Sequence, residues 1–309
     1  ARRNKANLLV LRGFTFGDWV PPIGDDRTPN PHIGDDCYST IYHFISNSLL
    51  SKISKILGDE KNYIFYKNKS DEIKKAFAEE FITVSGRLAY SDQTSYAMCF
   101  VNDLIPDDKI DNAKEYFKQT ILNQNFKLGT GFHGTANLLK GLKKAGLEEM
   151  IERVLLQEKL PGWMYQIKQG ATSIWERWNA MAEDGSIHDP EMNSFNHYAF
   201  GSVCEFIFEN IVGIKPDEEN PGFKNIIIEP VIIPSFCPIS FKHESINGLI
   251  SVDIKIDNNN VIYKIEIPEG SRGELTLKNY NTIKVNGIDM DFSDIKLNSG
   301  VNLINFSIP

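Results

Sequence analysis

The sequence predicts a helical domain followed by an antiparallel β-sandwich, and two patterns support this fold class. Apolar residues recur at helical spacing through most of residues 1–221, and beyond residue 222 they alternate with polar residues as in half-buried strands. The 309 residues, with 41% hydrophobic and 24% charged content, suffice for one large and one smaller globular domain. We therefore expect an α+β multidomain chain with domains at 1–221 and 222–309.

The helical part is expected to begin with a loop and to continue as a series of amphipathic helices. Residues 17–36 are rich in Gly, Asp and Pro, which disfavour regular structure. Ser39 or Thr40 is the expected cap of the first helix, which Gly58 should end. A further short helix is expected to open at the segment that carries Glu176. Apolar periodicity predicts the other helices over residues 61–82, 92–104, 107–123, 134–145, 147–156 and 194–212.

The sandwich is predicted from the alternation of apolar and polar side chains beyond residue 222. In two segments, 250–257 and 261–267, every second residue is aliphatic or aromatic, and Asn258–Asn260 joins them. This pattern is typical of an antiparallel hairpin with one buried face. Gly, Asn and Pro separate the neighbouring strands, as expected for a β-sandwich.

Composition argues against several classes of partner and chemistry. The formal net charge of -8, without any block of Lys or Arg, argues against nucleic acid binding. Cys37, Cys99, Cys204 and Cys237 are far apart, so we expect reduced, buried thiols and no disulfide or zinc framework. No run approaches transmembrane length and no secretory segment is visible, so we expect no membrane partner and a cytoplasmic location. No metal-ligand spacing, phosphate-binding glycine motif or nucleophile elbow occurs, so neither a metal nor a cofactor is expected.

Two aromatic segments are the most informative part of the sequence. Residues 170–178 place Glu176 between two tryptophans, and residues 194–201 carry His197 among further aromatic residues. Aromatic faces bind the apolar side of sugar rings and exclude water, and carboxylates in such surroundings serve as catalytic acids or bases. The alternative is that the Trp-x-x-Trp spacing only places two rings on the buried face of a helix.

These two segments resemble conserved patterns of glycoside hydrolase family 78, the α-L-rhamnosidases. They match the patterns G-A-T-T-x-W-E-R-W and S-x-N-H-Y-A-x-G of that family. Four other segments resemble its F-G-D-W, S-D-T-Q-T-A-Y, T-T-G-F-x-G-T and P-S-W-x-Y patterns, at residues 16–20, 91–96, 129–135 and 161–165. The matches are collinear and extend from about residue 14 to residue 201, so they cover nearly the whole helical part.

The resemblance implies roles for four residues. Family 78 enzymes release terminal α-L-rhamnose with inversion, which would make Glu176 the general base that takes a proton from the attacking water. Asp18 would accept hydrogen bonds from sugar hydroxyls, and Trp19 would stack on the ring. His197 would contact the substrate near the base. The alternatives are a turn aspartate and a core tryptophan for the first pair, and a structural histidine for His197.

Three further residues are weaker candidates for substrate contact. Trp163 and Trp175 would provide aromatic faces for the sugar, with packing in the core as the alternative. His133 stands where an apolar residue is common in the family, and it would add a hydrogen bond to a leaving-group sugar or be a surface substitution. Glu158 and Glu191 match no position of the family and are expected to be solvated.

The second catalytic carboxyl group is missing from the match. In the family, the general acid is a glutamate in an R-D-E-R-type segment upstream of F-G-D-W, and these 309 residues contain no such segment. The Gly-Asp-Asp pairs at 24–26 and 34–36 are better explained as solvated turns than as paired catalytic carboxylates. The resemblance thus leaves open whether the isolated chain is active.

The resemblance also implies an incomplete (α/α)6 toroid that carries the active site, followed by a C-terminal β-sandwich. Such a toroid has about twelve helices and about eight are predicted here, so we expect its N-terminal part to be missing and apolar flanks to be exposed. The missing part of the same protein or a second copy of the chain would cover them. The leading interpretation is an inverting α-L-rhamnosidase. The alternatives are a sugar-binding fragment without catalysis and another (α/α)6 glycosidase or lyase for uronic acids, which would need basic residues beyond Arg177.

Overall fold

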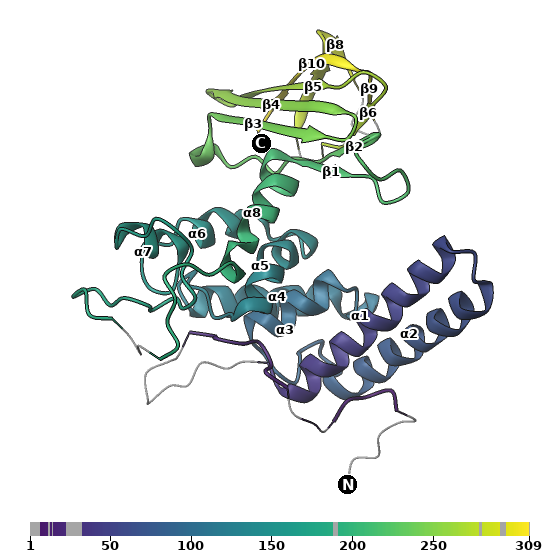
Figure 1. The fold of residues 1–309 in the computed structure, drawn as a ribbon, viewed down its shortest axis with the longest axis vertical. Helices are drawn as coiled ribbons and strands as arrows, with labels where there is room; N and C mark the ends of the chain where they lie inside the picture. The colour runs from purple at the N-terminus through teal and green to yellow at the C-terminus, as the bar shows by residue number, and fades with distance from the viewer. Residues whose placement is uncertain are drawn as a thin grey trace. The chain divides into compact units, whose positions relative to one another are not determined.

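Two compact units, residues 1–203 and residues 204–309, make up the chain (Figure 1). The computed structural model describes residues 7–11, 13, 15–22, 33–187, 191–277, 280–290 and 295–308. The first unit is helical and the second consists largely of antiparallel sheets, which confirms the predicted fold class. The boundary lies earlier than 221/222, because Val212 and Ile214 pack in the core of the β unit.

The helical unit begins with a long antiparallel hairpin of α1 (Asp35–Ile56) and α2 (Glu60–Phe81) (Figure 1). The predicted cap at Ser39 or Thr40 is wrong, because α1 already begins at Asp35. Asp35 and Asp36 occupy its first turn, where the helix dipole stabilises acidic side chains, so these residues are helical and not part of the preceding loop. Gly58 turns the chain between the two helices with a φ of +71°, as predicted from its place after the apolar pattern.

The centre of the helical unit is formed by α3 (Gln93–Val101), η1 (Asp107–Lys109), α4 (Ile110–Asn123) and α5 (Phe132–Lys144). Nearly all of α3 is buried, and its contact with α5 is close. A Cβ atom added to Gly141 of α5 would lie 2.7 Å from the Cα atom of Ala97 on α3, so only glycine permits this approach. On the other side of α3, Tyr96 and Phe100 stack on Phe117 of α4.

The remaining elements of this region are η2 (Glu148–Met150), α6 (Ile151–Leu155), α7 (Trp163–Lys168), η3 (Ala199–Ser202), α8 (Val203–Phe206) and the π-helical turn η4 (Ile207–Val212). Helix α7 is not predicted from the sequence because its six residues are too few to show a helical period. The helix predicted over 194–212 begins only at Ala199, and the segment around Glu176 is not helical. In both cases the backbone pairs across segments 174–176 and 194–197 instead of forming helical hydrogen bonds.

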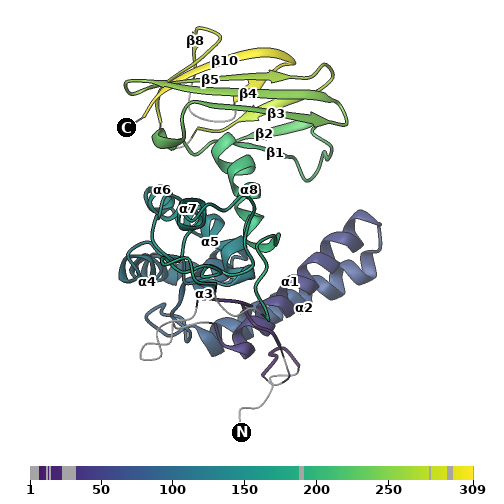
Figure 2. The same cartoon turned by 60° about the vertical axis from the view of Figure 1, so that its left-hand side comes forward.

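The second unit contains two sheets (Figure 2). Its elements are β1 (Ile214–Pro216), β2 (Asn225–Ile228), η5 (Pro234–Phe236), β3 (Ile239–Ser245), β4 (Gly248–Asp257), β5 (Asn260–Ile267), β6 (Arg272–Leu275), β7 (Asn281–Val285), β8 (Ile288–Asp289), β9 (Ile295–Leu297) and β10 (Gly300–Ser307). One sheet has the order β3-β4-β5-β10-β7-β8 and is antiparallel throughout. The other has the order β1-β2-β6-β9, in which β2 and β6 pair in parallel.

The predicted hairpin is confirmed by β4 and β5, which pair with Ile254 opposite Tyr263. The alternating apolar side chains of both strands are buried, and residues of the two sheets contribute to one shared core. Tyr263 lies fully inside this core and donates its hydroxyl proton to the carbonyl oxygen of Val212 at 2.8 Å. Burial without that bond would leave a polar group unsatisfied.

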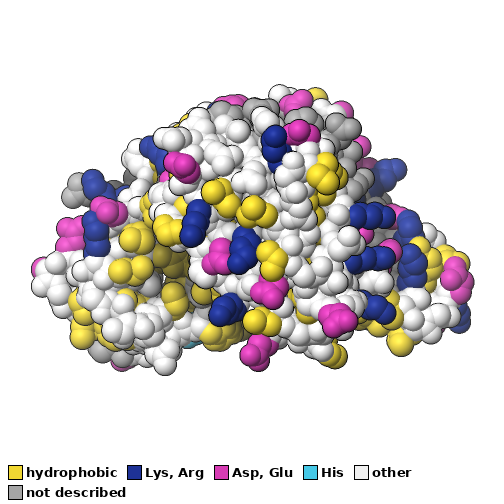
Figure 3. All heavy atoms as spheres, turned by 90° about the horizontal axis from the view of Figure 1, so that it is seen from above, with side chains coloured by type: hydrophobic (Ala, Val, Ile, Leu, Met, Phe, Trp, Pro, Cys, Tyr) yellow, Lys and Arg dark blue, Asp and Glu magenta, His cyan; other side chains and the backbone are white. Residues whose placement is uncertain are grey.

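The surface carries charges of both signs. On the face shown in Figure 3, Lys and Arg side chains lie among Asp and Glu side chains and hydrophobic ones. None of the described helices is long and apolar enough to cross a membrane. The four cysteines are free, but only Cys37 and Cys99 are buried. Cys204 is exposed and Cys237 is half-buried, so the expectation of four buried thiols is wrong for these two.

Candidate active site

Asp18 of the loop at residues 15–22 is bound entirely by protein groups. Its Oδ1 atom accepts the backbone N–H groups of His133 at 2.9 Å and Gly134 at 2.8 Å. Its Oδ2 atom accepts the N–H of Gly131 at 2.7 Å and the hydroxyl of Thr94 at 2.5 Å. The side chain is only 5% exposed. A carboxylate usually accepts about four hydrogen bonds, and Asp18 already accepts four. It therefore has no position left to accept the predicted hydrogen bonds from sugar hydroxyls.

Two glycines make this arrangement possible. A Cβ atom on Gly134 would lie 2.4 Å from Oδ2 of Asp18 and 2.1 Å from Oγ1 of Thr94. A Cβ atom on Gly131 would lie 2.3 Å from the carbonyl oxygen of Trp19. Real Cβ atoms do not approach other atoms so closely, so both positions require glycine. The F-G-D-W, S-D-Q-T and T-G-F-H-G segments therefore form one structural unit at the N-terminus of α5.

Trp19 is held beside this unit with an open face. Its carbonyl oxygen accepts the N–H of Phe132 at 2.9 Å, while its ring contacts Phe16 edge to face at a centroid distance of 5.0 Å. The side chain is 41% exposed. The next residue, Val20, has a φ of +56°, which is rare for a β-branched residue and shows that the loop is held by its contacts. Trp19 thus has the exposed aromatic surface that sugar stacking requires.

Glu176 lies in an extended segment paired with the segment that carries His197. The N–H of Glu176 donates to the carbonyl oxygen of Ser194 at 2.8 Å, and the N–H of His197 donates to that of Ile174 at 2.8 Å. The Oε2 atom of Glu176 accepts the N–H of Ser194 at 2.9 Å. Among the described residues, its Oε1 atom accepts no hydrogen bond, and the side chain is half-buried. One carboxylate oxygen is therefore fixed and the other is available.

His197 connects this pair of segments to α5. Its ring stacks on Phe132 at a centroid distance of 5.0 Å and on Tyr198 at 5.1 Å. Its Nδ1 atom accepts the N–H of Ala199 at 3.3 Å, which leaves Nε2 as the protonated nitrogen of the neutral ring. Because Phe132 also binds the carbonyl of Trp19, the loop with Trp19 and the segment with His197 meet at one residue.

Comparisons with known proteins show the family to which the chain belongs. Residues 1–211 match the model of the bacterial alpha-L-rhamnosidase 6 hairpin glycosidase domain, and residues 213–287 match that of the bacterial alpha-L-rhamnosidase C-terminal domain. The chain belongs to the bacterial α-L-rhamnosidase family. This confirms the family indicated by the sequence motifs.

Several named relatives and solved structures of the rhamnosidase family are similar to the chain. α-L-Rhamnosidases of Formosa agariphila and Streptomyces avermitilis are 29% and 34% identical over 273 and 215 residues, covering 87% and 70% of this chain. The crystal structure of the Streptomyces avermitilis enzyme complexed with L-rhamnose has a TM-score of 0.86 at 26% identity over 96% of this chain. That of native Aspergillus terreus α-L-rhamnosidase has a TM-score of 0.84 at 28% identity over 95%.

The chain corresponds to only part of each of these rhamnosidases. It spans 29% of the Formosa agariphila relative and 20% of the Streptomyces avermitilis relative. It covers 28% of the Streptomyces avermitilis structure and 33% of the Aspergillus terreus structure.

The tryptophans other than Trp19 are buried in this chain. Trp175 is 2% exposed and packs with Tyr165, Ala180 and the edge of Phe195. Trp163 is 7% exposed, and its indole N–H donates to a backbone carbonyl. The structure thus corrects the expectation that Trp163 and Trp175 offer open faces to a sugar, because neighbouring aromatic side chains such as Trp178 and Phe195 pack against these rings.

His133 lies away from the paired segments, against α1. Its ring is exposed and stacks on Tyr38 with a centroid distance of 5.6 Å, and its Nδ1 atom is hydrogen bonded to the Tyr38 hydroxyl. Burial, followed by the neighbouring Tyr42, raises the pKa of Tyr38 well above its ordinary value. Tyr38 therefore remains a neutral hydroxyl at any ordinary pH. The predicted contact of His133 with a leaving-group sugar stays a prediction.

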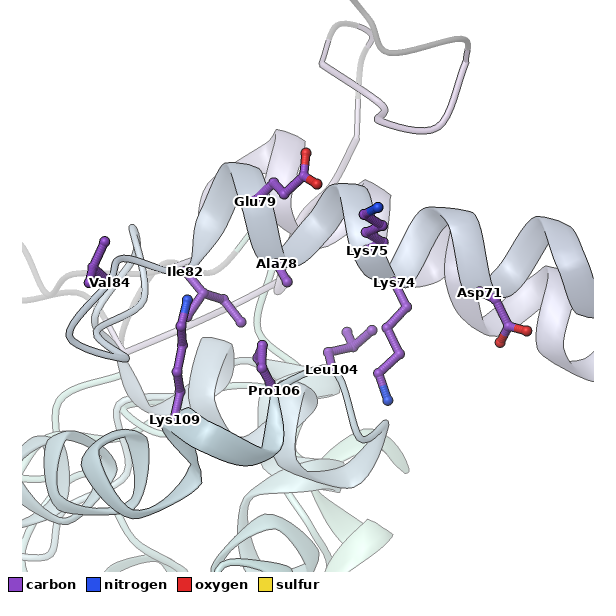
Figure 4. A pocket seen from close by; sticks show the side chains of 10 residues that line it. All are labelled: Asp71, Lys74, Lys75, Ala78, Glu79, Ile82, Val84, Leu104, Pro106 and Lys109. Carbon is purple, nitrogen blue, oxygen red and sulfur yellow. The ribbon is translucent and has the colours of Figure 1, made fainter.

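The described residues give no other strong candidate for the site. They contain no cluster of three His, Cys, Asp or Glu residues that could hold a metal ion. A pocket of about 610 Å³ lies elsewhere, between the C-terminal half of α2 and the segment that leads into α4 (Figure 4). Glu158 pairs with Lys168, which agrees with its expected place at the surface. Asp25 and Asp26 lie outside the described residues.

Sequence reasoning did not single out Thr94 and Phe132. Thr94 lies in the S-D-Q-T-S-Y segment and Phe132 in the G-T-G-F-H-G-T segment, so motif membership was the only available signal. Their roles depend on contacts between residues far apart in the sequence. Thr94 binds Asp18, 76 positions away, and Phe132 stacks on His197. Local spacing cannot show such contacts.

Proposed function

We propose that this chain forms part of the catalytic module of an α-L-rhamnosidase, which hydrolyses terminal α-L-rhamnose from glycosides or oligosaccharides. The observation that carries the proposal is the pairing of the Glu176 and His197 segments inside the residues that match the glycosidase domain. The exposed ring of Trp19, joined to His197 through Phe132, supplies a surface for the sugar.

In the proposed mechanism Glu176 acts as the general base. The N–H of Ser194 holds its Oε2 atom, which leaves Oε1 to accept a proton from a water molecule attacking the anomeric carbon. Release with inversion needs a second carboxyl group, roughly 6.5 to 9.5 Å from the first, to protonate the leaving oxygen. Since the 309 residues contain no R-D-E-R-type segment, we propose that another part of the protein supplies that acid.

The α1–α2 hairpin supports the proposal of such a further part. Its outer half exposes an aliphatic and aromatic stripe, the hairpin surface, formed by Leu49, Leu50, Ile53, Ile56, Leu57, Ile64 and Phe65. The side of α1 that faces α2 instead buries Asn47, Ser51 and Ser54, and the Ser51 hydroxyl donates to the carbonyl oxygen of Tyr63. Figures 1 and 2 both show this half of the hairpin projecting from the other helices of its unit. An apolar stripe at helical spacing on the outside of a hairpin is typical of a packing interface.

We propose that a further helical hairpin of the glycosidase domain covers the hairpin surface. The matched domain has 6 hairpins, which means twelve helices, whereas the described part of this chain has eight α-helices. Replacing Ile53 and Ile56 by lysine should lower the binding of an apolar dye to the chain without unfolding it. In a protein that carries all the hairpins, the same two replacements should leave dye binding unchanged if the surface is already covered. A dimer of the unmodified chain that dissociates in the double variant would instead show that a second copy covers the surface.

The catalytic proposal is tested with Glu176→Gln in a protein that carries this chain and the remaining hairpins. Turnover of an aryl α-L-rhamnoside should fall about 10²- to 10⁴-fold, because glutamine cannot take the proton from water. Glu158→Gln, which removes a surface ion pair, is the matched control and should keep full turnover. Proton NMR of the first product anomer should show inversion. Normal turnover by Glu176→Gln would refute the assignment.

The second candidate is a sugar-binding fragment without catalysis, which the absent acid segment favours. Calorimetry with L-rhamnose beside an activity assay on this chain separates the two functions. Binding without turnover supports the fragment, and turnover excludes it. A site for uronic acids is disfavoured because Arg177 donates its Nε proton to the carbonyl oxygen of Met192 at 2.7 Å, which fixes the guanidinium beside the backbone.

A further inference from the structure

We infer that Asp18 is a positioning residue that fixes the Trp19 loop to the N-terminus of α5, and that it is not a sugar ligand. This inference rests on the proposed function for its link to sugar binding. Its structural basis is independent of that function, because it consists of four hydrogen bonds to one buried carboxylate.

The contacts of Asp18 account for a strong local attachment. Three of its donors are consecutive or nearly consecutive backbone N–H groups, at Gly131, His133 and Gly134, where α5 begins. The first N–H groups of a helix have no partner within the helix, and the helix dipole favours a negative charge beside them. Hydrogen bonds to an ionised acceptor are also stronger than neutral ones. Asp18 therefore takes the place of a cap residue, although it lies 113 residues before Gly131 in the sequence.

The attachment determines where the Trp19 ring lies. The carbonyl oxygen of Trp19 accepts the N–H of Phe132, so both residues of the loop, Asp18 and Trp19, bind the same turn of α5. Phe132 in turn stacks on His197 and contacts Phe200 edge to face. Loss of the Asp18 bonds would leave this part of the loop attached to α5 only through the Trp19 carbonyl, and the Trp19 ring would be held less firmly relative to His197.

The packing around Asp18 disfavours the replacement of one of its four donors by a sugar hydroxyl. For Asp18 to bind a sugar hydroxyl, one of its four present donors would have to give up its bond, and a buried N–H or O–H group without a partner is destabilising. A sugar would also have to reach a side chain that is 5% exposed. Trp19, at 41% exposed, is the residue of this loop that a ligand can contact.

The test compares a change in the carboxylate with a change that only displaces it. Asp18→Asn replaces one acceptor oxygen by an NH2 group, which donates and cannot accept the N–H groups of α5. Gly134→Ala keeps the carboxylate but places a Cβ atom 2.4 Å from Oδ2, so it should push Asp18 away from α5. Thr94→Val removes one of the four bonds and is the milder variant if either of the others fails to fold. Asp59→Asn is the matched control, since Asp59 caps α2 through the N–H of Asn62.

The first readout is acrylamide quenching of Trp19 fluorescence. Trp19 is the most exposed of the four tryptophans, and the signal lost in Trp19→Phe identifies its contribution. Quenching should rise in Asp18→Asn and Gly134→Ala, by at most about 2.4-fold, the ratio of full exposure to 41%. It should rise less in Thr94→Val and not at all in Asp59→Asn. Unchanged quenching in Asp18→Asn would overturn the inference.

The second readout is the affinity for L-rhamnose, measured by calorimetry. If Asp18 positions Trp19, Asp18→Asn and Gly134→Ala should both weaken binding about tenfold or more. If Asp18 binds the sugar directly, Asp18→Asn should lose affinity with unchanged Trp19 quenching, and that outcome overturns the inference. Absence of L-rhamnose binding by a protein that carries this chain and the remaining hairpins would contradict the proposed function, and the quenching result would then decide the positioning role alone.

Discussion

Replacing Trp175 by alanine should lower the free energy of unfolding of the helical unit by about 3 to 5 kcal/mol, the cost of truncating a buried tryptophan. The side chain is 2% exposed and packs against Tyr165, Ala180 and Phe195, so its removal leaves a cavity that these neighbours cannot fill without moving. Trp19→Ala is the matched control. It loses an edge-to-face contact with Phe16 from a ring that is 41% exposed, which should cost only about 0.5 to 1.5 kcal/mol.

Urea unfolding followed by circular dichroism at the helical band measures both changes. For a slope of about 2 to 3 kcal/mol per M, Trp175→Ala should lower the midpoint by about 1 to 2.5 M. Trp19→Ala should lower it by less than half as much and should weaken L-rhamnose binding instead. The reasoning would be refuted if Trp175→Phe unfolded like the unmodified chain yet failed to bind L-rhamnose, because the Trp175 ring would then act on the sugar rather than in the core.

Three further predictions follow from groups buried outside the site. Tyr263→Phe should destabilise the β unit by about 1 to 2 kcal/mol, measured by urea unfolding, because the carbonyl oxygen of Val212 loses its partner; an unchanged midpoint would contradict the bond. Burial raises the pKa of Tyr38, so the Tyr38 hydroxyl of the unfolded chain loses its proton first as the pH rises through 10. The free energy of unfolding should therefore be unaffected by this group below pH 10 and should fall above it, less steeply in Tyr38→Phe. A thiol reagent should modify exposed Cys204 rapidly in the folded chain and Cys99 only on unfolding, because burial raises the pKa of Cys99 and blocks access of the reagent to it. Equal rates of modification at the two cysteines would contradict this prediction.

The elements that the sequence predicted well are those whose signal is local. Alternation along β4 and β5 predicts both the strands and their buried faces, because successive side chains of a strand point to opposite sides of the sheet. The long helices α1 and α2 follow from a 3.6-residue period in the same way. Helix α7 carries no such signal because six residues are too few to show a helical period. The extended Glu176 segment carries none because its conformation depends on hydrogen bonds to residues 194–197.

The candidate site shows the same division. The motif match placed Glu176 and His197 in one site, and the backbone pairing of their segments agrees with that placement. It could not separate Trp19 from Trp175, because both are tryptophans beside an acidic residue. Exposure separates them, and it is set by the side chains that pack over each ring.

The sequence by itself determined the fold class, the family and the identity of the acidic residue proposed as the base, since periodicity and motif order are properties of the chain alone. Only the tertiary structure showed that Asp18 is filled by four protein donors, that Trp19 keeps an open face, and that the hairpin surface is exposed. The physical reason is that hydrogen-bond saturation and solvent exposure depend on long-range packing, which brings Asp18 to residues more than a hundred positions away.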